Sequence, residues 1–163
     1  MPNIASFIRL ICGGRLSGVS YLPVVVAVGL GVGHPSARAS AEAEMCDLYF
    51  SGGVVLEQVP VARTQAQQAR GLMKQNDVGN GMLFEWEIEE QRAFWMRNTW
   101  VPLSIGFFSA DGTLFAIKDM EPETDDYHFS GRPAQDALEL AQGEFERKGL
   151  VVGSRLTRRV CGT

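Results

Sequence analysis

Short apolar segments separated by turn-forming residues follow one another from residue 47 to the end of the chain. Each is four to eight residues long and carries the β-branched and aromatic side chains that strands prefer. These segments are residues 47–50, 54–61, 81–86, 93–97, 103–108, 114–117, 137–140 and 155–160. They predict a mostly β (α+β) fold, a small, partly closed antiparallel sheet or barrel. With 163 residues, the chain has room for one such domain and not for two.

Two further segments have the composition of short helices. Residues 65–73 are mostly good helix formers and follow Thr64, whose hydroxyl can cap a helix N-terminus. Residues 143–148 are interpreted as one or two helical turns that end at Gly149. We therefore expect one or two short helices to cover an edge or an opening of the sheet.

Turn residues indicate how the predicted strands connect. Residues 51–53 and the pair Asp111-Gly112 each lie between two apolar segments, which indicates two hairpins. Pro60 has no backbone N–H and therefore indicates an edge position or a strand end. Residues 121–133 begin with an acidic stretch and show no periodicity, so they are interpreted as a long loop, of a kind that is often functional.

The first 39 residues differ from the rest because they contain no Asp or Glu. Arg9 and Arg15 precede an uncharged apolar run at residues 21–32, and the small-residue triplet Ala37-Arg38-Ala39 follows. This order is typical of a secretory signal peptide. A membrane anchor is the alternative, but a 12-residue run is shorter than the roughly 20 residues that span a bilayer.

The sequence thus predicts a signal peptide at residues 1–39 and a single compact β-rich domain at residues 40–163. Ala41-Glu42-Ala43 offers a second cleavage site, after Ala43. The expected product is an exported bacterial protein, periplasmic or secreted, with no stable membrane span after cleavage.

The charge of the processed chain argues against nucleic acid as a partner. Cleavage after Ala39 removes three of the 15 basic residues and none of the 19 acidic ones, which leaves a formal charge of −7. A surface that follows phosphates needs clustered Lys and Arg. The one such cluster, Arg155, Arg158 and Arg159, alternates with apolar residues as a strand face would.

Export also determines how the cysteines are interpreted. Cys12 would leave with the signal peptide, so Cys46 and Cys161 remain as one pair in an oxidising compartment and predict a disulfide. Closing so long a loop would stabilise the fold by about 4 to 5 kcal/mol. A nucleophilic thiol is the alternative, but it needs a base, and His128 is the single histidine left after cleavage.

We expect no metal and no cofactor. Zinc sites use clustered Cys and His, which the processed chain lacks. Methionine thioethers could bind cuprous ion, but scattered methionines are ordinarily core residues. The processed chain has five of them: Met45, Met73, Met82, Met96 and Met120.

Several motifs occur in a fixed order along the predicted domain. They are Arg70-Gly71-Leu72-Met73, Gly81-Met82-Leu83-Phe84, Phe94-Trp95-Met96-Arg97-Asn98-Thr99 with Val101-Pro102-Leu103, Asp111-Gly112, Leu138-Glu139-Leu140 and Gly143. Together they resemble the family called domain of unknown function 192, over residues 48–160. The resemblance implies a compact, mostly β domain, often exported and often alone in its chain, with no established activity.

One position departs from the pattern of that family. After the Pro-Leu pair, its members generally carry an aspartate before two aliphatic residues, whereas this chain has Ser104-Ile105-Gly106. Ser104 can form hydrogen bonds but carries no charge. Any chemistry that depended on that carboxylate would be absent here.

The candidate ligand-binding residues come mainly from the motifs. If residues 93–97 form a strand, alternation places Phe94, Met96 and Asn98 on one face and Trp95, Arg97 and Thr99 on the other. Aromatic rings beside amide and guanidinium groups resemble a platform for a sugar, peptide or small molecule. The candidates are Arg70, Met73, Trp95, Arg97, Asn98, Thr99, Ser104 and Glu139.

Each of these candidates also has a purely structural interpretation. The guanidinium of Arg70 suits a ligand anion but could equally pair with an internal acid such as Glu139 or Glu85. Leu72 and Met73 could seat the helix on the sheet, and Asn98 and Thr99 could merely close a turn.

A non-catalytic binding or accessory module of the cell envelope is the function the sequence favours, and we predict no catalytic residue. Its partner would be a small molecule, glycan, peptide or envelope protein. The alternative is a hydrolytic or transfer enzyme that uses His128 with a nearby carboxylate. No serine lies in a nucleophile elbow, and the acidic runs are more typical of solvated faces than of paired catalytic carboxylates.

Overall fold

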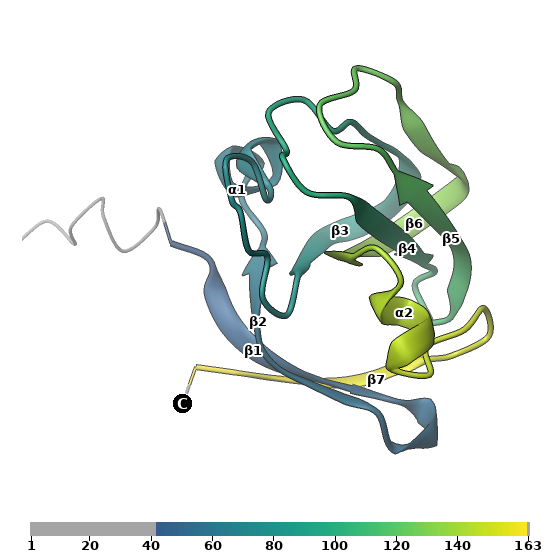
Figure 1. The fold of residues 1–163 in the computed structure, drawn as a ribbon. Helices are drawn as coiled ribbons and strands as arrows, with labels where there is room; N and C mark the ends of the chain where they lie inside the picture. The colour runs from purple at the N-terminus through teal and green to yellow at the C-terminus, as the bar shows by residue number, and fades with distance from the viewer. Residues whose placement is uncertain (1–41, 163) are drawn as a thin grey trace, which may run out of the picture. The chain divides into compact units, whose positions relative to one another are not determined.

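The computed structural model describes residues 42–162, which form one seven-stranded sheet that curls into a half-barrel (Figure 1). The strands are β1 (Glu44–Phe50), β2 (Val55–Ala62), β3 (Met82–Phe94), β4 (Leu103–Phe108), β5 (Leu114–Met120), β6 (His128–Ala141) and β7 (Leu156–Cys161). Two short helices, α1 (Gln65–Arg70) and α2 (Glu144–Arg147), and the 3-10 turn η1 (Ser51–Gly53) complete the domain. The predicted mostly β fold with a partly closed sheet is therefore confirmed.

The strand order is β5-β4-β6-β3-β2-β1-β7, and every neighbouring pair is antiparallel except β2 and β3. The two predicted hairpins are present, β1-β2 around η1 and β4-β5 around Asp111-Gly112. Pro60 lies in an interior strand rather than at a sheet edge. At Pro60, β2 pairs with β1 only, because its pairing with β3 begins at the next residue, Val61. The missing N–H of Pro60 therefore costs no hydrogen bond to β3.

Two long strands correct the sequence-based boundaries. The predicted strand at residues 93–97 is the end of β3, which stops at Phe94, and the predicted loop at residues 121–133 already belongs to β6 from His128 onward. These strands pair with each other from Met82 opposite Glu139 to Phe94 opposite His128, with register shifts along the way. The partner of this stretch lies far away in sequence, so local composition could not reveal the pairing.

The curled sheet carries an apolar core on each of its faces. One core is enclosed by the curl, in which α2 lies (Figure 1). There Phe145 of α2 and Leu150 pack against residues of β1, β2 and β7, including Leu48, Val59 and Leu156. The other core lies on the opposite face: Leu72, Phe84, Met96, Ile105 and Phe107. The second core is the one that positions the candidate site, because α1 and the loop after β3 cover it.

Helix α1 begins at the cap that the sequence predicts but ends at a glycine inside the predicted segment. The Thr64 hydroxyl accepts a hydrogen bond from the Gln67 N–H, and the Gln67 side chain completes a capping box. The helix ends three residues earlier than the predicted 65–73 because Gly71 has a positive φ of 47°. A Cβ at Gly71 would lie at an ordinary contact distance, 3.4 Å, from the ring of Phe84, so the positive φ rather than lack of space favours glycine here.

No helix among residues 42–162 is long and apolar enough to cross a membrane. The predicted signal peptide at residues 1–39 lies outside the described residues.

Candidate functional site

A cavity of about 310 Å³ lies between α1 and the face of β3 and β6. We call it the α1 pocket. Its lining residues come from α1, the turn after it, β3, the loop after β3 and β6: Gln68, Ala69, Arg70, Gly71, Leu72, Met73, Phe84, Trp86, Ala93, Phe94, Trp95, Thr99, Tyr127 and Glu139. The size is at the lower end of the range for small-molecule sites, roughly 300 to 1,000 Å³.

Aromatic rings form much of the pocket wall. Phe94 packs edge-on against both Phe84 and Trp86, with ring centroids 4.9 and 6.2 Å apart, and Trp95 lies 5.7 Å from Tyr127. Phe84 and Trp86 point to the same side of β3 because side chains two residues apart in a strand share a face. The wall therefore offers a flat apolar body several ring surfaces.

Glu139 is the buried acidic residue of the α1 pocket. It lies on β6 between Met82 of β3 and Ile105 of β4, and only 4% of its surface is exposed. Its carboxyl makes no hydrogen bond or ion pair with any other side chain among the described residues, and burial raises its pKa to about 8. At neutral pH this carboxyl therefore keeps its proton and can donate a hydrogen bond into the cavity.

Arg70 lies at the exposed end of the same pocket. Neither acid considered as its partner from the sequence is paired with it, and it forms no ion pair within residues 42–162. Glu85 instead accepts a hydrogen bond from Arg63 at 2.9 Å and lies 3.9 Å from Arg159. The guanidinium of Arg70 thus has no acidic partner in the described part of the chain.

The segment after β3 does not alternate as predicted, because it leaves the sheet at Phe94. Met96 and Thr99, predicted on opposite faces, are both buried, at 0% and 4% exposure. Asn98 has a φ of 58°, and its carbonyl accepts a hydrogen bond from the Lys74 N–H. Asn98 therefore shapes a turn and does not line the pocket, whereas Trp95 and Thr99 do.

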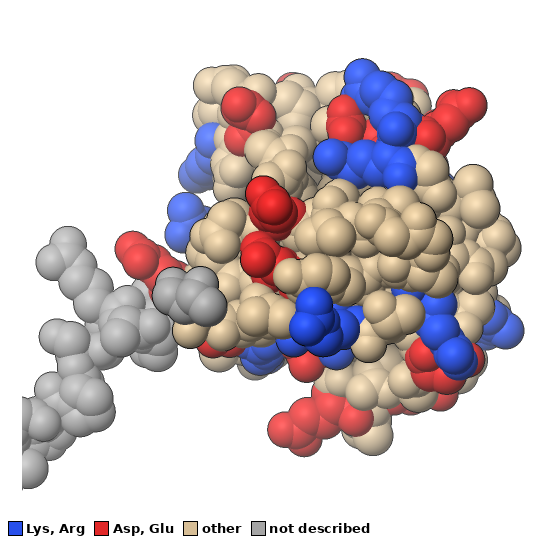
Figure 2. Space-filling model, turned by 90° about the horizontal axis from the view of Figure 1, so that it is seen from below, with Lys and Arg blue, Asp and Glu red and all other residues tan. Residues whose placement is uncertain are grey.

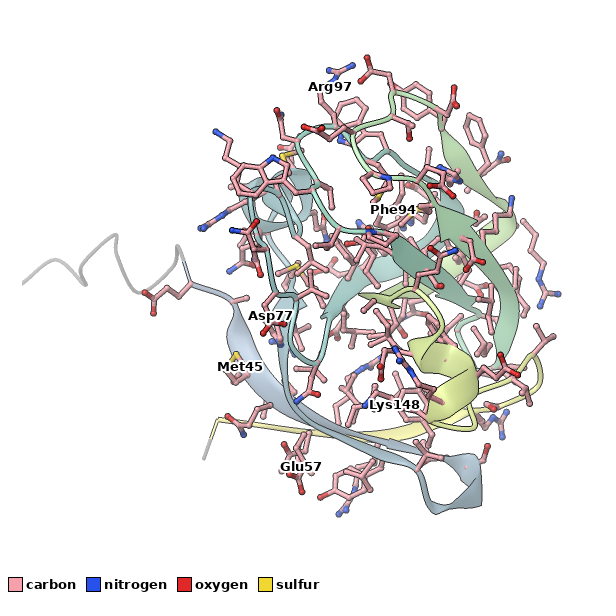
Figure 3. The ribbon with its side chains drawn as sticks, in the orientation of Figure 1. Met45, Glu57, Asp77, Phe94, Arg97 and Lys148 are labelled. Carbon is pink, nitrogen blue, oxygen red and sulfur yellow. A yellow bond between two sulfur atoms is a disulfide. The ribbon has the colours of Figure 1, made fainter. Side chains whose placement is uncertain are left out.

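Arg97 lies outside the pocket, at the outer end of the loop, whereas Phe94 points inward (Figure 3). Its guanidinium stacks over the Trp95 ring at 4.7 Å and donates a hydrogen bond to Asp125 at 2.7 Å. That hydrogen bond raises the pKa of Arg97. Arg92 covers the Trp86 ring in the same way, at 4.3 Å. These two arginines thus stack on two rings of the pocket wall.

Ser104 belongs to a different hollow, beside α2. Its hydroxyl donates a 2.6 Å hydrogen bond to Asp119, the residue opposite it on β5. The hydroxyl of Ser104 is thus bonded to a carboxylate of the neighbouring strand. Gln142, Phe145 and Leu150 line the same hollow.

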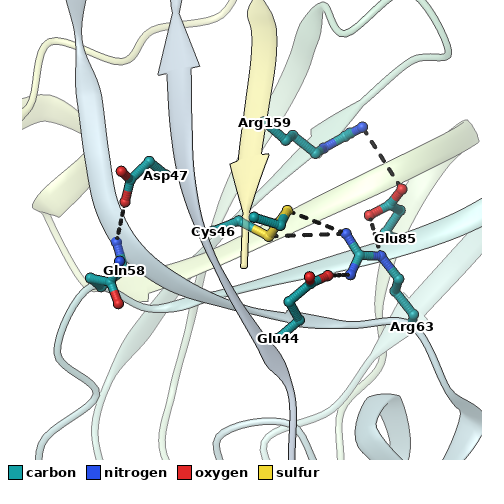
Figure 4. The surroundings of a disulfide bond; sticks show 8 residues. Glu44, Cys46, Asp47, Gln58, Arg63, Glu85 and Arg159 are labelled. Carbon is teal, nitrogen blue, oxygen red and sulfur yellow. Dashed lines mark hydrogen bonds and ion pairs between the residues drawn. A yellow bond between two sulfur atoms is a disulfide. The ribbon is translucent and has the colours of Figure 1, made fainter. Parts of the chain in front are cut away.

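The structure joins Cys46 and Cys161 in the disulfide predicted from the sequence, between β1 and β7 (Figure 4). Arg63 lies beside it, with one guanidinium nitrogen 3.6 Å from the Cys161 sulfur, and pairs with Glu44 and Glu85. Glu44 and the two cysteines are the one group of metal-ligand types brought together within residues 42–162. Their sulfurs bind each other and the carboxylate binds Arg63, so this group is poorly suited to hold a metal.

His128, the residue of the alternative enzymatic hypothesis, begins β6. Its Nε2 is buried and has no hydrogen-bond partner in the described part of the chain. No hydrogen bond or ion pair within that part joins it to a carboxylate. The geometry therefore adds no support to a His–carboxylate catalytic pair.

Sequence reasoning identified five of the pocket residues, namely Arg70, Met73, Trp95, Thr99 and Glu139, but missed most of the aromatic wall. The i, i+2 spacing of Phe84 and Trp86 on a strand was a signal that could have revealed two of its rings. Tyr127 carried no such signal, because it reaches the pocket from the connection between β5 and β6.

Comparisons with known proteins agree with this fold. The family model DUF192, described as "Uncharacterized ACR", matches residues 50–158. A protein from Sinorhizobium meliloti 1021, named as a proposed transcription regulator, is 28% identical with a TM-score of 0.64, over 74% of this chain and 95% of that one. A protein of unknown function from Novosphingobium aromaticivorans DSM 12444 is also 28% identical, with a TM-score of 0.64, over 77% and 90%. No curated protein matches the chain significantly.

Proposed function

The chain belongs to the DUF192 family, and from this premise we propose that it is a non-catalytic binding domain of the cell envelope whose ligand site is the α1 pocket. The ligand is a small organic molecule, or a group of similar size on a glycan, a peptide or an envelope protein. The chain binds it between α1 and the sheet, against the aromatic wall and above Glu139.

The observation that carries this proposal is that residues of separate motifs line one cavity. The first motif of the resemblance contributes Arg70, Gly71, Leu72 and Met73 to the lining, the second Phe84, the third Phe94, Trp95 and Thr99, and a later one Glu139. These stretches are up to about 70 residues apart in the sequence, yet they converge on one cavity. A core alone would not require a carboxyl there, since burying an unpaired polar group costs free energy.

Export forms part of the proposal. The order of charges and apolar residues over residues 1–39 and the Cys46–Cys161 disulfide both support delivery to an oxidising compartment. On the face seen in Figure 2, Lys and Arg lie among Asp and Glu rather than forming a continuous basic surface. A role on DNA, suggested by the name of the Sinorhizobium protein, would need such a surface.

Mass spectrometry on the protein isolated from its own cells tests the proposal. Under native conditions we expect an additional mass that disappears on denaturation, which identifies a noncovalent ligand. The denatured mass should correspond to a chain without residues 1–39 or 1–43 and with two hydrogens fewer than the reduced form. A full-length mass would contradict export, and a bare native mass at every concentration tested would contradict a tightly held ligand.

Two tryptophan variants locate the ligand. Trp95 lines the α1 pocket, whereas Trp100 is 46% exposed and does not. We expect Trp95→Ala to weaken binding by about fivefold or more, since stacking on an aromatic ring contributes roughly 1 kcal/mol or more. Trp100→Ala serves as the matched control and should bind as the unaltered protein does. Equal affinities of the two variants would place the ligand elsewhere.

A further inference from the structure

Three of the residues that line the α1 pocket ionise in water, and they lie at different depths. Glu139 is at the floor with 4% exposure, while Arg70 and Tyr127 are exposed at the mouth. The apolar neighbours of Glu139 in the sheet, Met82 and Ile105, bring no charge near its carboxyl. The charge that a ligand meets in this pocket is therefore set by Glu139 and Arg70.

At neutral pH the pocket is positively charged. Burial alone raises the pKa of Glu139 to about 8, so the carboxyl is protonated and neutral when the pocket is empty. Arg70 keeps its charge and has no acidic partner within residues 42–162. The two arginines that stack on Trp86 and Trp95 differ from Arg70, because Arg92 pairs with Glu90 and Arg97 with Asp125.

Resting on the binding function proposed above, we propose that the ligand of the α1 pocket is an organic anion, a carboxylate on a flat apolar body. Its negative group pairs with Arg70 at the mouth, and its body lies against the rings of Phe84 and Trp95. An acceptor oxygen at its inner end takes the hydrogen bond that the Glu139 carboxyl donates.

Each end of this arrangement removes an unfavourable feature of the empty pocket. The anion gives Arg70 the partner it lacks, and planar guanidinium groups bind carboxylates with two parallel hydrogen bonds. The inner oxygen gives the protonated carboxyl of Glu139 an acceptor, which no other side chain among the described residues supplies. An organic cation would meet the opposite situation, because Glu139 would have to lose its proton in an apolar site and Arg70 would repel the ligand.

Three probes of nearly equal shape test the charge of the ligand: 4-hydroxyphenylacetate, its neutral amide 4-hydroxyphenylacetamide, and the cation tyramine. Two of the three tryptophans line the pocket, so tryptophan fluorescence and calorimetry can both follow binding to the exported domain. We expect the carboxylate to bind about tenfold more tightly than the amide, and tyramine to bind most weakly.

Variants of Arg70 and Glu139 test which residue binds each end of the ligand. Arg70→Gln should bring the carboxylate and the amide to equal affinity. Arg158→Gln, an exposed arginine on β7 that also forms no ion pair within the described residues, is the control and should leave the preference unchanged. In the unaltered protein, affinity for the carboxylate should fall as pH rises past 8, and Glu139→Gln should abolish that fall because an amide donates at every pH.

The outcomes separate this proposal from the binding function on which it rests. Tyramine binding best, with affinity that rises toward pH 9, would overturn the anion and leave the pocket as a binding site for a cation. Equal binding of all three probes, or of none at millimolar concentration, would also overturn it. The native mass experiment does not depend on ligand charge, so a copurified molecule without an acidic group would contradict the anion while supporting the binding domain.

Discussion

At the scale of single residues, Glu139 makes the stability of the domain depend on pH. Its pKa is about 8 in the folded domain, against an ordinary value of 4.5, so the folded state binds the proton more tightly than the unfolded one. Its contribution is therefore most favourable below pH 4.5, declines as pH rises to about 8, and stays constant above. At pH 7 the cost of burying this carboxyl is on the order of 3 kcal/mol.

We expect Glu139→Gln to be more stable than the unaltered protein at pH 7 and equal to it near pH 4. Urea unfolding at several pH values between 4 and 9 measures the difference. Asp136 also makes the domain less stable as pH rises, because burial raises its pKa to about 6 despite the opposing charge of Arg159. Its contribution persists in the variant, so only part of the slope should disappear. Parallel curves for the two proteins would show that Glu139 is not buried as described.

At the scale of elements, α1 forms one wall of the pocket although it is only six residues long. So short a helix is not stable by itself, and it depends on its capping box and on the packing of Leu72. Thr64→Ala removes the hydroxyl that accepts the Gln67 N–H and should destabilise the domain by about 1 kcal/mol. Thr64→Ser keeps the hydroxyl and should cost much less.

Because α1 contributes Gln68, Ala69 and Arg70 to the lining, the Thr64→Ala variant should also bind the ligand more weakly. Hydrogen exchange of the α1 amides, measured beside the affinity, checks whether the helix frays. Unchanged exchange and affinity in Thr64→Ala would mean that packing alone holds the helix in place.

A comparison of the predicted and observed helices and strands indicates which parts of the fold could be predicted from the sequence. Both hairpins and the N-terminal cap of α1 depend on residues within a few positions of each other, such as Thr64 with Gln67, and the sequence indicated them correctly. The extents of β3 and β6 depend on pairing between residues 34 to 57 positions apart, from Phe94 with His128 to Met82 with Glu139. Composition around residues 128–133 gave no sign of that partner, so a strand was interpreted as a loop.

The candidate site divides in the same way. Arg70, Met73, Trp95, Thr99 and Glu139 were selected for their chemistry, and the structure brings these five to one cavity. Arg97 and Asn98 were selected with them because a strand was expected to continue through residue 97. The chain instead turns at Asn98, where φ is positive, and this turn directs both side chains away from the pocket. The end of a strand thus determines which residues next to a motif line the pocket together with it.

At the scale of the whole domain, the disulfide joins the first strand to the last. β7 lies at the edge of the sheet and pairs with β1 alone, with Cys46 opposite Cys161. The two cysteines are 115 residues apart in sequence, so their bond removes much of the conformational freedom of the unfolded chain. The chain-entropy estimate for such a loop is about 4 to 5 kcal/mol. This is a large part of the 5 to 15 kcal/mol, roughly, that stabilises a typical domain.

We therefore expect the Cys46→Ser/Cys161→Ser double variant to unfold at a markedly lower urea concentration, with a loss of about 2 to 5 kcal/mol. Reductant should lower the stability of the unaltered protein by a similar amount and leave the double variant unchanged, which separates loss of the bond from the effect of serine itself. Hydrogen exchange should increase first in β7, since its other interactions with the sheet are those of an edge strand. Equal stability with and without the bond would mean that the pairing of β7 with β1 suffices, and that the disulfide reflects the compartment rather than a need of the fold.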